Sequence, residues 1–197
     1  MIKRHRVYNL LINNAYKSLK QAVIPATCKC TTVYSSRLVK KLLKKNILQK
    51  HAKNSILVSN PLMLAFILGF EKDFGIPLCF KFSNYNDAIT ILNTTTYSLT
   101  LDSALSIKRG LVPKKLQAYV LGKDIPELME NFTTSVKDPD LIVYSSDMFR
   151  FLHQNLVNNV FTVSDWDLLV DLLANSAVNT ALTFAKEFKL FKTINRV

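Results

Sequence analysis

The sequence predicts an α+β protein. Apolar residues recur at helical spacing in three segments, residues 7–22, 35–45 and about 166–191. Segments rich in β-branched and aromatic residues lie between them, for example 27–33 and 76–82. Because 49% of the 197 residues are hydrophobic, the chain can build a packed core, either in one large domain or in two small ones.

The first half of the chain is predicted to alternate between helices and strands. Helices are expected at 7–22, 35–45 and 60–70, and strands at 27–33 and 47–58. Ser35 or Ser36 is expected to cap the second helix, and Asn60 followed by Pro61 is a signal for the start of the third. The third helix has only nine consecutive apolar residues, and a membrane span needs about 20, so no membrane span is expected.

The second half is predicted to be rich in strands and to end in a long helix. Strands are expected at 76–82, 89–96, 98–107 and 141–144, and short helices at 124–130 and 147–154. Ser164-Asp-Trp-Asp167 resembles a capping box and begins a helix that runs from Trp166 to about Phe191. Apolar residues cover well over one face of this helix. We therefore expect it to dock a neighbouring protein, or alternatively to pack on its own domain.

Basic residues are segregated along the chain. The first seventy residues contain thirteen Lys and Arg and no Asp or Glu, and the remaining residues contain thirteen bases and fourteen acids. The net charge of +12 therefore arises in the first third of the chain. Such a field of one sign attracts a polyanion, which indicates nucleic acid, with an acidic membrane surface or a merely solvated basic face as alternatives.

No residue pattern indicates catalysis, a metal site or a cofactor. The chain lacks a Gly-rich phosphate loop, a paired metal-ligand motif and a nucleophile elbow. Cys28 and Cys30 are closely spaced, but no second ligand pair follows to complete a zinc site, so reduced thiols are expected. Three aspartates near the start of the C-terminal helix are expected to compensate its dipole. We therefore expect that the protein is not an enzyme.

Four short motifs follow one another between residues 7 and 165. The first motif is Tyr34-Ser35-Ser36-Arg37, which starts the basic helix that ends at Lys45-Asn46-Ile47-Leu48. The other three motifs are Cys79-Phe80-Lys81-Phe82, Lys123-Asp124-Ile125-Pro126 and Leu141-Ile142-Val143-Tyr144-Ser145-Ser146. In this order they resemble the small-subunit ribosomal protein eight family of bacteria, archaea and organelles. In that family the last motif is a signature loop that contacts RNA through hydroxyls and backbone groups.

The chain also departs from the family pattern. Tyr34 replaces the proline before the double serine, and Asp147-Met148 replace the Lys-Gly that follows the signature serines. The arginines usual in the first helix are replaced by Asn13, Asn14 and Ala15. Some of the family's RNA contacts are therefore expected to be weakened or moved elsewhere.

The resemblance implies a domain organisation of two small packed α/β modules. The basic N-terminal module is expected at 1–82 with an insertion at about 60–73, the β-rich module at 83–165, and a C-terminal helical extension at 166–197. Whether the insertion belongs to the core or to an interface stays open.

The resemblance also implies a function. It implies a structural constituent of the small ribosomal subunit that binds central-domain rRNA and helps its assembly. The alternative is a nucleic-acid-binding accessory factor outside the ribosome. Lys outnumbers Arg by twenty to six, as in proteins from AT-rich organellar genomes, so we expect a mitochondrial protein. The expected RNA-binding residues are Tyr34, Ser35, Ser36, Arg37, Lys40, Lys41, Lys44, Lys45, Tyr144, Ser145 and Ser146.

Overall fold

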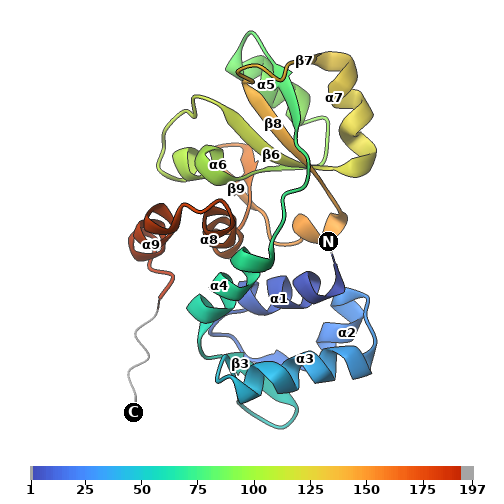
Figure 1. Cartoon of the computed structure of the whole chain (residues 1–197), viewed down its shortest axis with the longest axis vertical. Coiled ribbons are helices and arrows are strands. Elements are labelled where there is room, and N and C mark those ends of the chain that lie inside the picture. Colours follow the sequence, from blue (N-terminus) through green and yellow to red (C-terminus); the bar gives the residue numbers. More distant parts are fainter. Residues whose placement is uncertain (1, 192–197) are drawn as a thin grey trace. The chain divides into compact units, whose positions relative to one another are not determined.

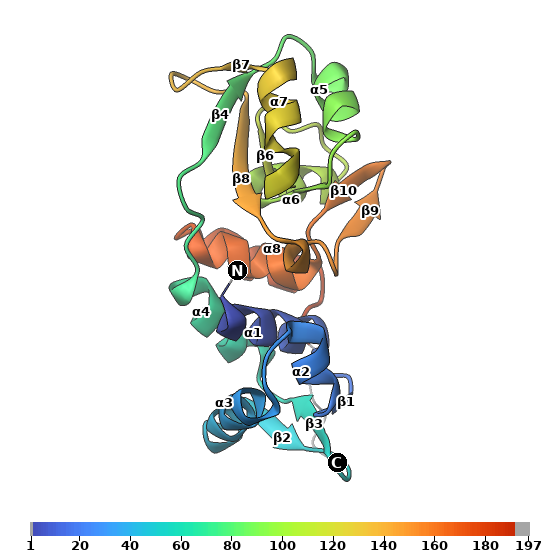
Figure 2. The same cartoon turned by 90° about the vertical axis from the view of Figure 1, so that its right-hand side faces the viewer.

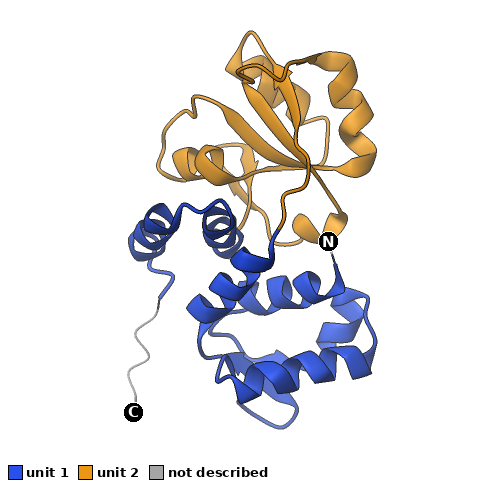
Figure 3. Cartoon of the chain, in the orientation of Figure 1, with its two compact units in different colours: residues 1–72, 165–197 blue, residues 73–164 orange. Residues whose placement is uncertain are grey.

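The computed structural model describes residues 2–191 and has an α+β fold (Figure 1). Its internal contacts divide the chain into two units, unit 1 with residues 1–72 and 165–197 and unit 2 with residues 73–164 (Figure 3). The division after residue 72 comes earlier than the boundary expected after residue 82, because β4 joins the sheet of unit 2. The expected extension belongs to unit 1, although its residues 192–197 lie outside the described part.

Unit 1 consists of helices and one small sheet. Its elements are α1 (Lys3–Asn13), β1 (Leu19–Lys20), α2 (Val23–Cys28), α3 (Thr32–Lys44), β2 (Leu48–Lys50), β3 (Ser55–Val58), α4 (Pro61–Glu71), α8 (Asp165–Ala174) and α9 (Val178–Glu187). The three strands are antiparallel in the order β1-β3-β2. The β structure expected at 47–58 is therefore confirmed, and it consists of two strands that form a hairpin.

Two predictions near the N-terminus are wrong. The first helix ends at Asn13 rather than at residue 22, and Tyr16 beyond it has a φ of 61°, which a helix cannot accommodate. The strand expected at 27–33 is replaced by α2 and the start of α3. Ile24 and Cys28, four residues apart, are both buried by α2, so burial at helical spacing outweighs the local β-propensity.

Helix caps decide where α3 and α4 begin. The Thr31 hydroxyl accepts a hydrogen bond from the Tyr34 amide at 3.2 Å, so Thr31 caps α3 and the expectation of a Ser35 or Ser36 cap is wrong. The Asn60 side chain accepts from the Met63 amide at 3.0 Å, and α4 begins at Pro61 as predicted.

The C-terminal segment is two helices rather than the one expected from Trp166 to Phe191. The break lies at Ser176, which has a φ of 59°. Residues 167–173 of α8 are all buried, and α8 packs against α4, α1 and α9. Where α8 meets α4, a Cβ on Gly69 would lie 2.8 Å from the Leu173 Cβ. The apolar surface of α8 is thus covered within unit 1, as in the alternative that the segment packs on its own domain, and the docking of a neighbouring protein stays a prediction.

Polar contacts also hold α8 in unit 1. Asp171 is fully buried and forms an ion pair with Lys72, whose side chain is 6% exposed. Asp167 is buried and accepts hydrogen bonds from Asn9 and, at 3.3 Å, from the Asn13 amide. These two aspartates therefore connect α8 to α1 and to the end of α4, a role beyond the predicted compensation of a helix dipole.

Unit 2 contains a mixed parallel and antiparallel β-sheet, and helices connect several of its strands along the chain (Figure 2). Its elements are β4 (Leu78–Lys81), α5 (Tyr85–Leu92), β5 (Tyr97–Leu99), α6 (Leu101–Lys108), β6 (Leu116–Leu121), η1 (Gly122–Asp124), α7 (Ile125–Asn131), β7 (Thr133–Thr134), β8 (Leu141–Ser146), η2 (Met148–Arg150), β9 (Asn155–Val157) and β10 (Val160–Thr162). The strand order is β7-β4-β8-β6-β5-β10-β9, in which β6 is parallel to β8 and β5 to β10.

The predictions for unit 2 are confirmed in part. The strands expected at 76–82 and 141–144 and the helix at 124–130 are present as β4, β8 and α7. The strand expected at 89–96 is wrong, because α5 occupies 85–92 and buries Ala88 and Leu92 at helical spacing. The strand expected at 98–107 is mostly α6, and the helix expected at 147–154 is reduced to the single turn η2.

Candidate nucleic-acid interface

Five basic side chains lie together on the outer face of α3 and at its C-terminal end. All five are exposed and line a shallow depression of about 450 Å³; they are Arg37, Lys40, Lys41, Lys44 and Lys45. The opposite face of the helix buries Val39 and Leu42. An α-helix has 3.6 residues per turn, so positions 37, 41 and 44 lie on the face of α3 that points away from the core. We call these five residues the α3 face.

The charges of the α3 face have no acidic partner in residues 2–191: none of its five side chains forms an ion pair there. By sequence, unit 1 has eighteen Lys and Arg and five Asp and Glu, a net charge of +13. Three of these acids are engaged elsewhere. Glu71 contacts Arg4 at 3.0 Å and His5 at 3.7 Å, and the other two are the buried aspartates of α8. The positive field of the α3 face is therefore not cancelled locally.

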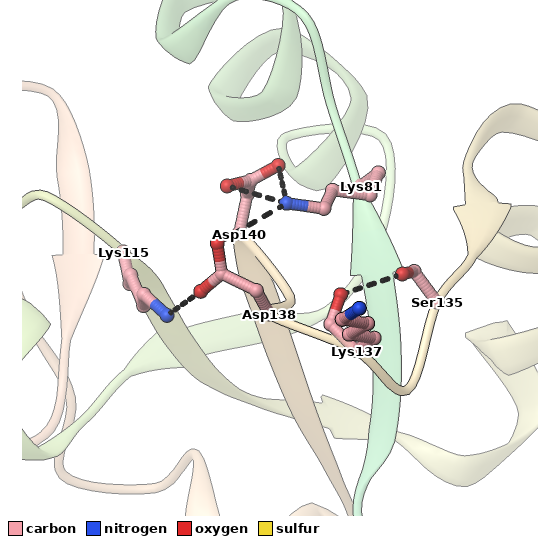
Figure 4. Close-up of polar contacts among 6 residues, drawn as sticks. All are labelled: Lys81, Lys115, Ser135, Lys137, Asp138 and Asp140. Atoms are coloured by element: carbon pink, nitrogen blue, oxygen red, sulfur yellow. Dashed lines mark hydrogen bonds and ion pairs between the residues drawn. The ribbon is translucent and has the colours of Figure 1, made fainter.

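Unit 2 differs in its charge arrangement. It has eight Lys and Arg and nine Asp and Glu by sequence, and several of these are paired. Lys81 lies 3.4 Å from Asp140, and Lys115 lies 2.5 Å from Asp138, at the turn before β8. Figure 4 shows these contacts. The hydrogen bond from Lys115 lowers the pKa of the Asp138 carboxyl, with further lowering by the charges of Lys115 and Lys81. Lys81 and Lys115 at this end of unit 2 are therefore matched by acids.

The residues at the start of α3 have different environments. Ser35 is buried, and its hydroxyl donates to the Thr32 carbonyl at 3.0 Å, so the prediction that Ser35 contacts RNA is wrong. The cause is the early start of the helix at Thr32, which turns position 35 toward the core. Tyr34 and Ser36 are half-buried and Arg37 is exposed, so these three keep access to the surface.

The expected signature loop is not a loop, because Tyr144, Ser145 and Ser146 are the last residues of strand β8. The Tyr144 ring packs on Phe74 and Tyr119, with ring centroids 5.0 and 5.9 Å apart, and burial raises the pKa of its hydroxyl. Ser145 is exposed, and Tyr144 and Ser146 are both half-buried, so Ser145 has the most access to the surface of these three residues. The predicted site residues belong to two units, those of α3 to unit 1 and those of β8 to unit 2.

Unit 1 has further exposed bases that were not among the predicted site residues. Lys20 on β1, Lys50 on β2 and Lys53 in the turn between β2 and β3 are all exposed. The signal in the sequence was the acid-free run itself, which includes them. The pairing of β1 with β3, a contact between distant parts of the chain, brings Lys20 into the sheet that also carries Lys50.

Comparisons with known proteins add no assignment: no protein-family model matches the chain, and no curated protein matches it. In residues 2–191, no three His, Cys, Asp or Glu side chains lie close enough together to hold a metal ion. Within the same range, no helix combines the length and the apolar character needed to span a bilayer. The α3 face is the candidate interface on the basis of its charge and geometry.

Proposed function

We propose that the protein binds structured RNA through the α3 face as a structural constituent of the mitochondrial small ribosomal subunit. In this role it binds central-domain rRNA and helps its assembly, and the role needs no catalytic group. The observation that carries the proposal is the cluster of five exposed bases without acidic partners in the described residues, on one surface of a unit with a net charge of +13. Phosphates supply most of the affinity for such a surface.

The dimensions of the α3 face suit a nucleic-acid backbone. At a rise of about 1.5 Å per residue, the stretch from Arg37 to Lys44 is about 10 Å long, enough to follow several phosphates. Four of the five bases are lysines, which bind phosphate as point charges, and Arg37 can donate two parallel hydrogen bonds. Such contacts position an RNA without reading its bases. Recognition would then depend on the shape of the RNA and on its 2′-hydroxyls.

The first helix supports the assignment of RNA contacts to α3. The family that the chain resembles has arginines in this helix, and one of the corresponding positions is Asn13. Asn13 donates to the buried Asp167 and to the Asn9 carbonyl at 3.0 Å, so its polar group serves the interior of unit 1. Because the Asn13 side chain is engaged inside unit 1, this arrangement supports the expectation that the RNA contacts made by the family's first helix have moved elsewhere in the basic segment.

An accessory factor outside the ribosome would use the same interface, so the two roles are separated by the strength of association. The experiment is sedimentation of the tagged protein from a mitochondrial extract through sucrose gradients at low and high salt. A ribosomal constituent stays with the small subunit in high salt, and an accessory factor leaves it. Sedimentation at the top of the gradient in both salts would contradict the ribosomal proposal.

A further inference from the structure

A pocket of about 510 Å³ lies in unit 2, on one face of its sheet. It is lined by Gln117 on β6 and Ile142 on β8, which are paired in register and therefore point to the same face. Both are half-buried, whereas Leu116 and Leu141, which point to the opposite face, are fully buried. The remaining lining comes from α6 and from the loop between α6 and β6. The volume lies within the range of about 300–1,000 Å³ of small-molecule sites.

Hydrogen bonds hold the elements around the pocket together. The Ser103 hydroxyl accepts from the Gln117 amide at 2.6 Å and donates to the Lys115 carbonyl at 2.8 Å, which fixes α6 against the start of β6. The Leu111 amide donates to the Ser106 carbonyl at 2.9 Å, so the loop after α6 is also anchored. The pocket is therefore formed before any ligand binds, which lowers the entropic cost of binding.

The Gln117 side chain has a fixed orientation in the pocket. Its Oε1 atom accepts a hydrogen bond from the Asp102 amide at 3.2 Å, so its NH₂ group remains as a donor. Within residues 2–191, this NH₂ group, the Asp102 carboxylate and the Ser106 hydroxyl have no hydrogen-bond or ion-pair partner. The pocket therefore offers a donor beside the two acceptor oxygens of a carboxylate.

The pocket also has an apolar part and a positive charge. Leu111, Val112 and Ile142 line it with aliphatic groups. Lys114 lines it as well, is exposed, and forms no ion pair in the part of the chain that the structure describes. A complementary ligand has flat apolar faces, a polar edge with donors and an acceptor, and an anionic group. A nucleotide combines these three properties.

We propose that this pocket binds one unpaired nucleotide of RNA whose base is guanine. Guanine presents two neighbouring donors, at N1 and at its 2-amino group, beside the O6 acceptor. The donors match the two oxygens of the Asp102 carboxylate, O6 matches the Gln117 NH₂ group, and Lys114 supplies a cation for the phosphate. The inference rests on the proposed function and adds base recognition to the backbone contacts of the α3 face. The nucleotide is unpaired, because pairing would occupy the same edge of the base.

The position of the pocket in the sheet favours a nucleotide over an extended peptide. A peptide that joins a sheet as an added strand does so at a free strand edge. The strand β6 lies between β8 and β5, and β8 lies between β4 and β6, so both strands are already paired on both sides. A ligand of this pocket is therefore contacted by side chains, as unpaired bases in RNA complexes are.

The test uses the full-length chain and RNA hairpins that differ only at a bulged position, which holds guanosine, inosine or no nucleotide. Inosine lacks only the 2-amino group of guanosine. Fluorescence anisotropy measures the dissociation constants at one salt concentration. The variant is Asp102→Asn and the matched control is Asp87→Asn. Both residues are exposed and lie in the first turn of an eight-residue helix of unit 2, and both substitutions remove one negative charge.

The wild type should bind the guanosine bulge about threefold to tenfold more tightly than the inosine bulge, which is the effect of one hydrogen bond. Asp102→Asn should lose this preference, because the amide replaces one of the two acceptor oxygens with a donor, and Asp87→Asn should keep it. Loss of charge alone would tighten the binding of all hairpins in both variants and leave the ratio unchanged. Equal binding of both bulges by the wild type, or a preserved preference in folded Asp102→Asn, would overturn the inference.

Two further outcomes separate this inference from the proposed function. If substitution of the α3 face flattens the salt slope but the wild type has no preference for guanosine, the pocket is refuted as a nucleotide site and the proposed function stands. If the protein binds none of the hairpins and that substitution leaves the slope unchanged, both are refuted. NMR then locates the contact: the amide signals of Asp102 and Gln117 should shift with the guanosine bulge and not with the hairpin that lacks a bulge. A preference for guanosine without these shifts would place recognition outside the pocket and overturn the inference.

Discussion

Replacing Asp171 with Asn tests whether α8 belongs to the core of unit 1. The Asp171 side chain is fully buried, and its ion-pair partner Lys72 is 6% exposed. The amide of Asn carries no charge, so the substitution removes the carboxylate that is paired with the buried Lys72 ammonium. Removing one member of a buried pair typically costs about 3–5 kcal/mol.

That cost gives a measurable shift in a urea titration. For a loss of about 4 kcal/mol and an m-value of about 2 kcal/mol per M, the unfolding midpoint of unit 1 falls by about 2 M. The double variant Lys72→Met, Asp171→Leu replaces both charges by apolar side chains of similar size. It should stay close to wild-type stability or exceed it, because neither charge is left buried alone.

Trp166 makes the assay specific for unit 1. It is the only tryptophan of the chain, lies on α8 and packs near Tyr16, with ring centroids 6.4 Å apart. Its fluorescence therefore reports on the contact between α8 and the N-terminal part of unit 1. Equal midpoints for the wild type and the Asp171→Asn variant would refute the argument that this pair holds α8 in the core.

Three further predictions concern packing and titration. Gly69→Ala should destabilise unit 1 by about 1–3 kcal/mol, because the new Cβ would lie 2.8 Å from the Leu173 Cβ. In the same urea assay, adding Leu173→Ala should recover part of the lost stability. The absence of any recovery would exclude this contact as the cause of the destabilisation. Lys115→Gln should raise the pKa of the Asp138 carboxyl toward its ordinary value, which an NMR titration measures. In the wild type this pKa is lower in the folded than in the unfolded state. The contact therefore stabilises the fold above the unfolded-state pKa, and this stabilisation is lost as the pH falls through the folded-state pKa. Burial raises the pKa of the Cys28 thiol to about 11, so iodoacetamide should alkylate Cys28 at neutral pH far more slowly than the other two cysteines. Mass spectrometry measures the three labelling rates, and equal rates would contradict the burial of Cys28.

The elements that the sequence predicted well carry local signals. The cap and proline at Asn60 and Pro61 define the start of α4, and the alternation of apolar and basic residues defines the two faces of α3. The strands β4 and β8 are short apolar runs bounded by polar residues. Each of these signals acts within a few residues, so it can be read without knowledge of the tertiary structure.

The errors arise where distant contacts decide the structure. Residues 23–28 and 85–92 are rich in β-formers, yet both fold as helices because each buries a pair of side chains four residues apart. The strand β6 was not predicted, although it lies between β8 and β5 in the sheet. The polar contacts of α8 were not predicted, because their partners Asn9 and Lys72 lie about a hundred residues or more away in sequence.

The candidate site was predicted only in part for the same reason. The five bases of the α3 face are exposed as expected, because their charge and spacing decide their exposure. Ser35 is buried, because the cap lies at Thr31 and shifts the helix start by several residues. The position of Lys20 was not predicted, since only the pairing of β1 with β3 brings it into the sheet that also carries Lys50.

Binding of the protein to RNA at several salt concentrations tests the central claim most directly. The variant replaces four lysines of the α3 face, Lys40, Lys41, Lys44 and Lys45, with Gln, and the probe is a transcript of the central domain of small-subunit rRNA. If most of these lysines contact phosphates, the log–log salt slope should be flatter than that of the wild type by roughly 2 to 3. An unchanged slope in a folded variant would contradict the account, because the α3 face would then not contact the RNA.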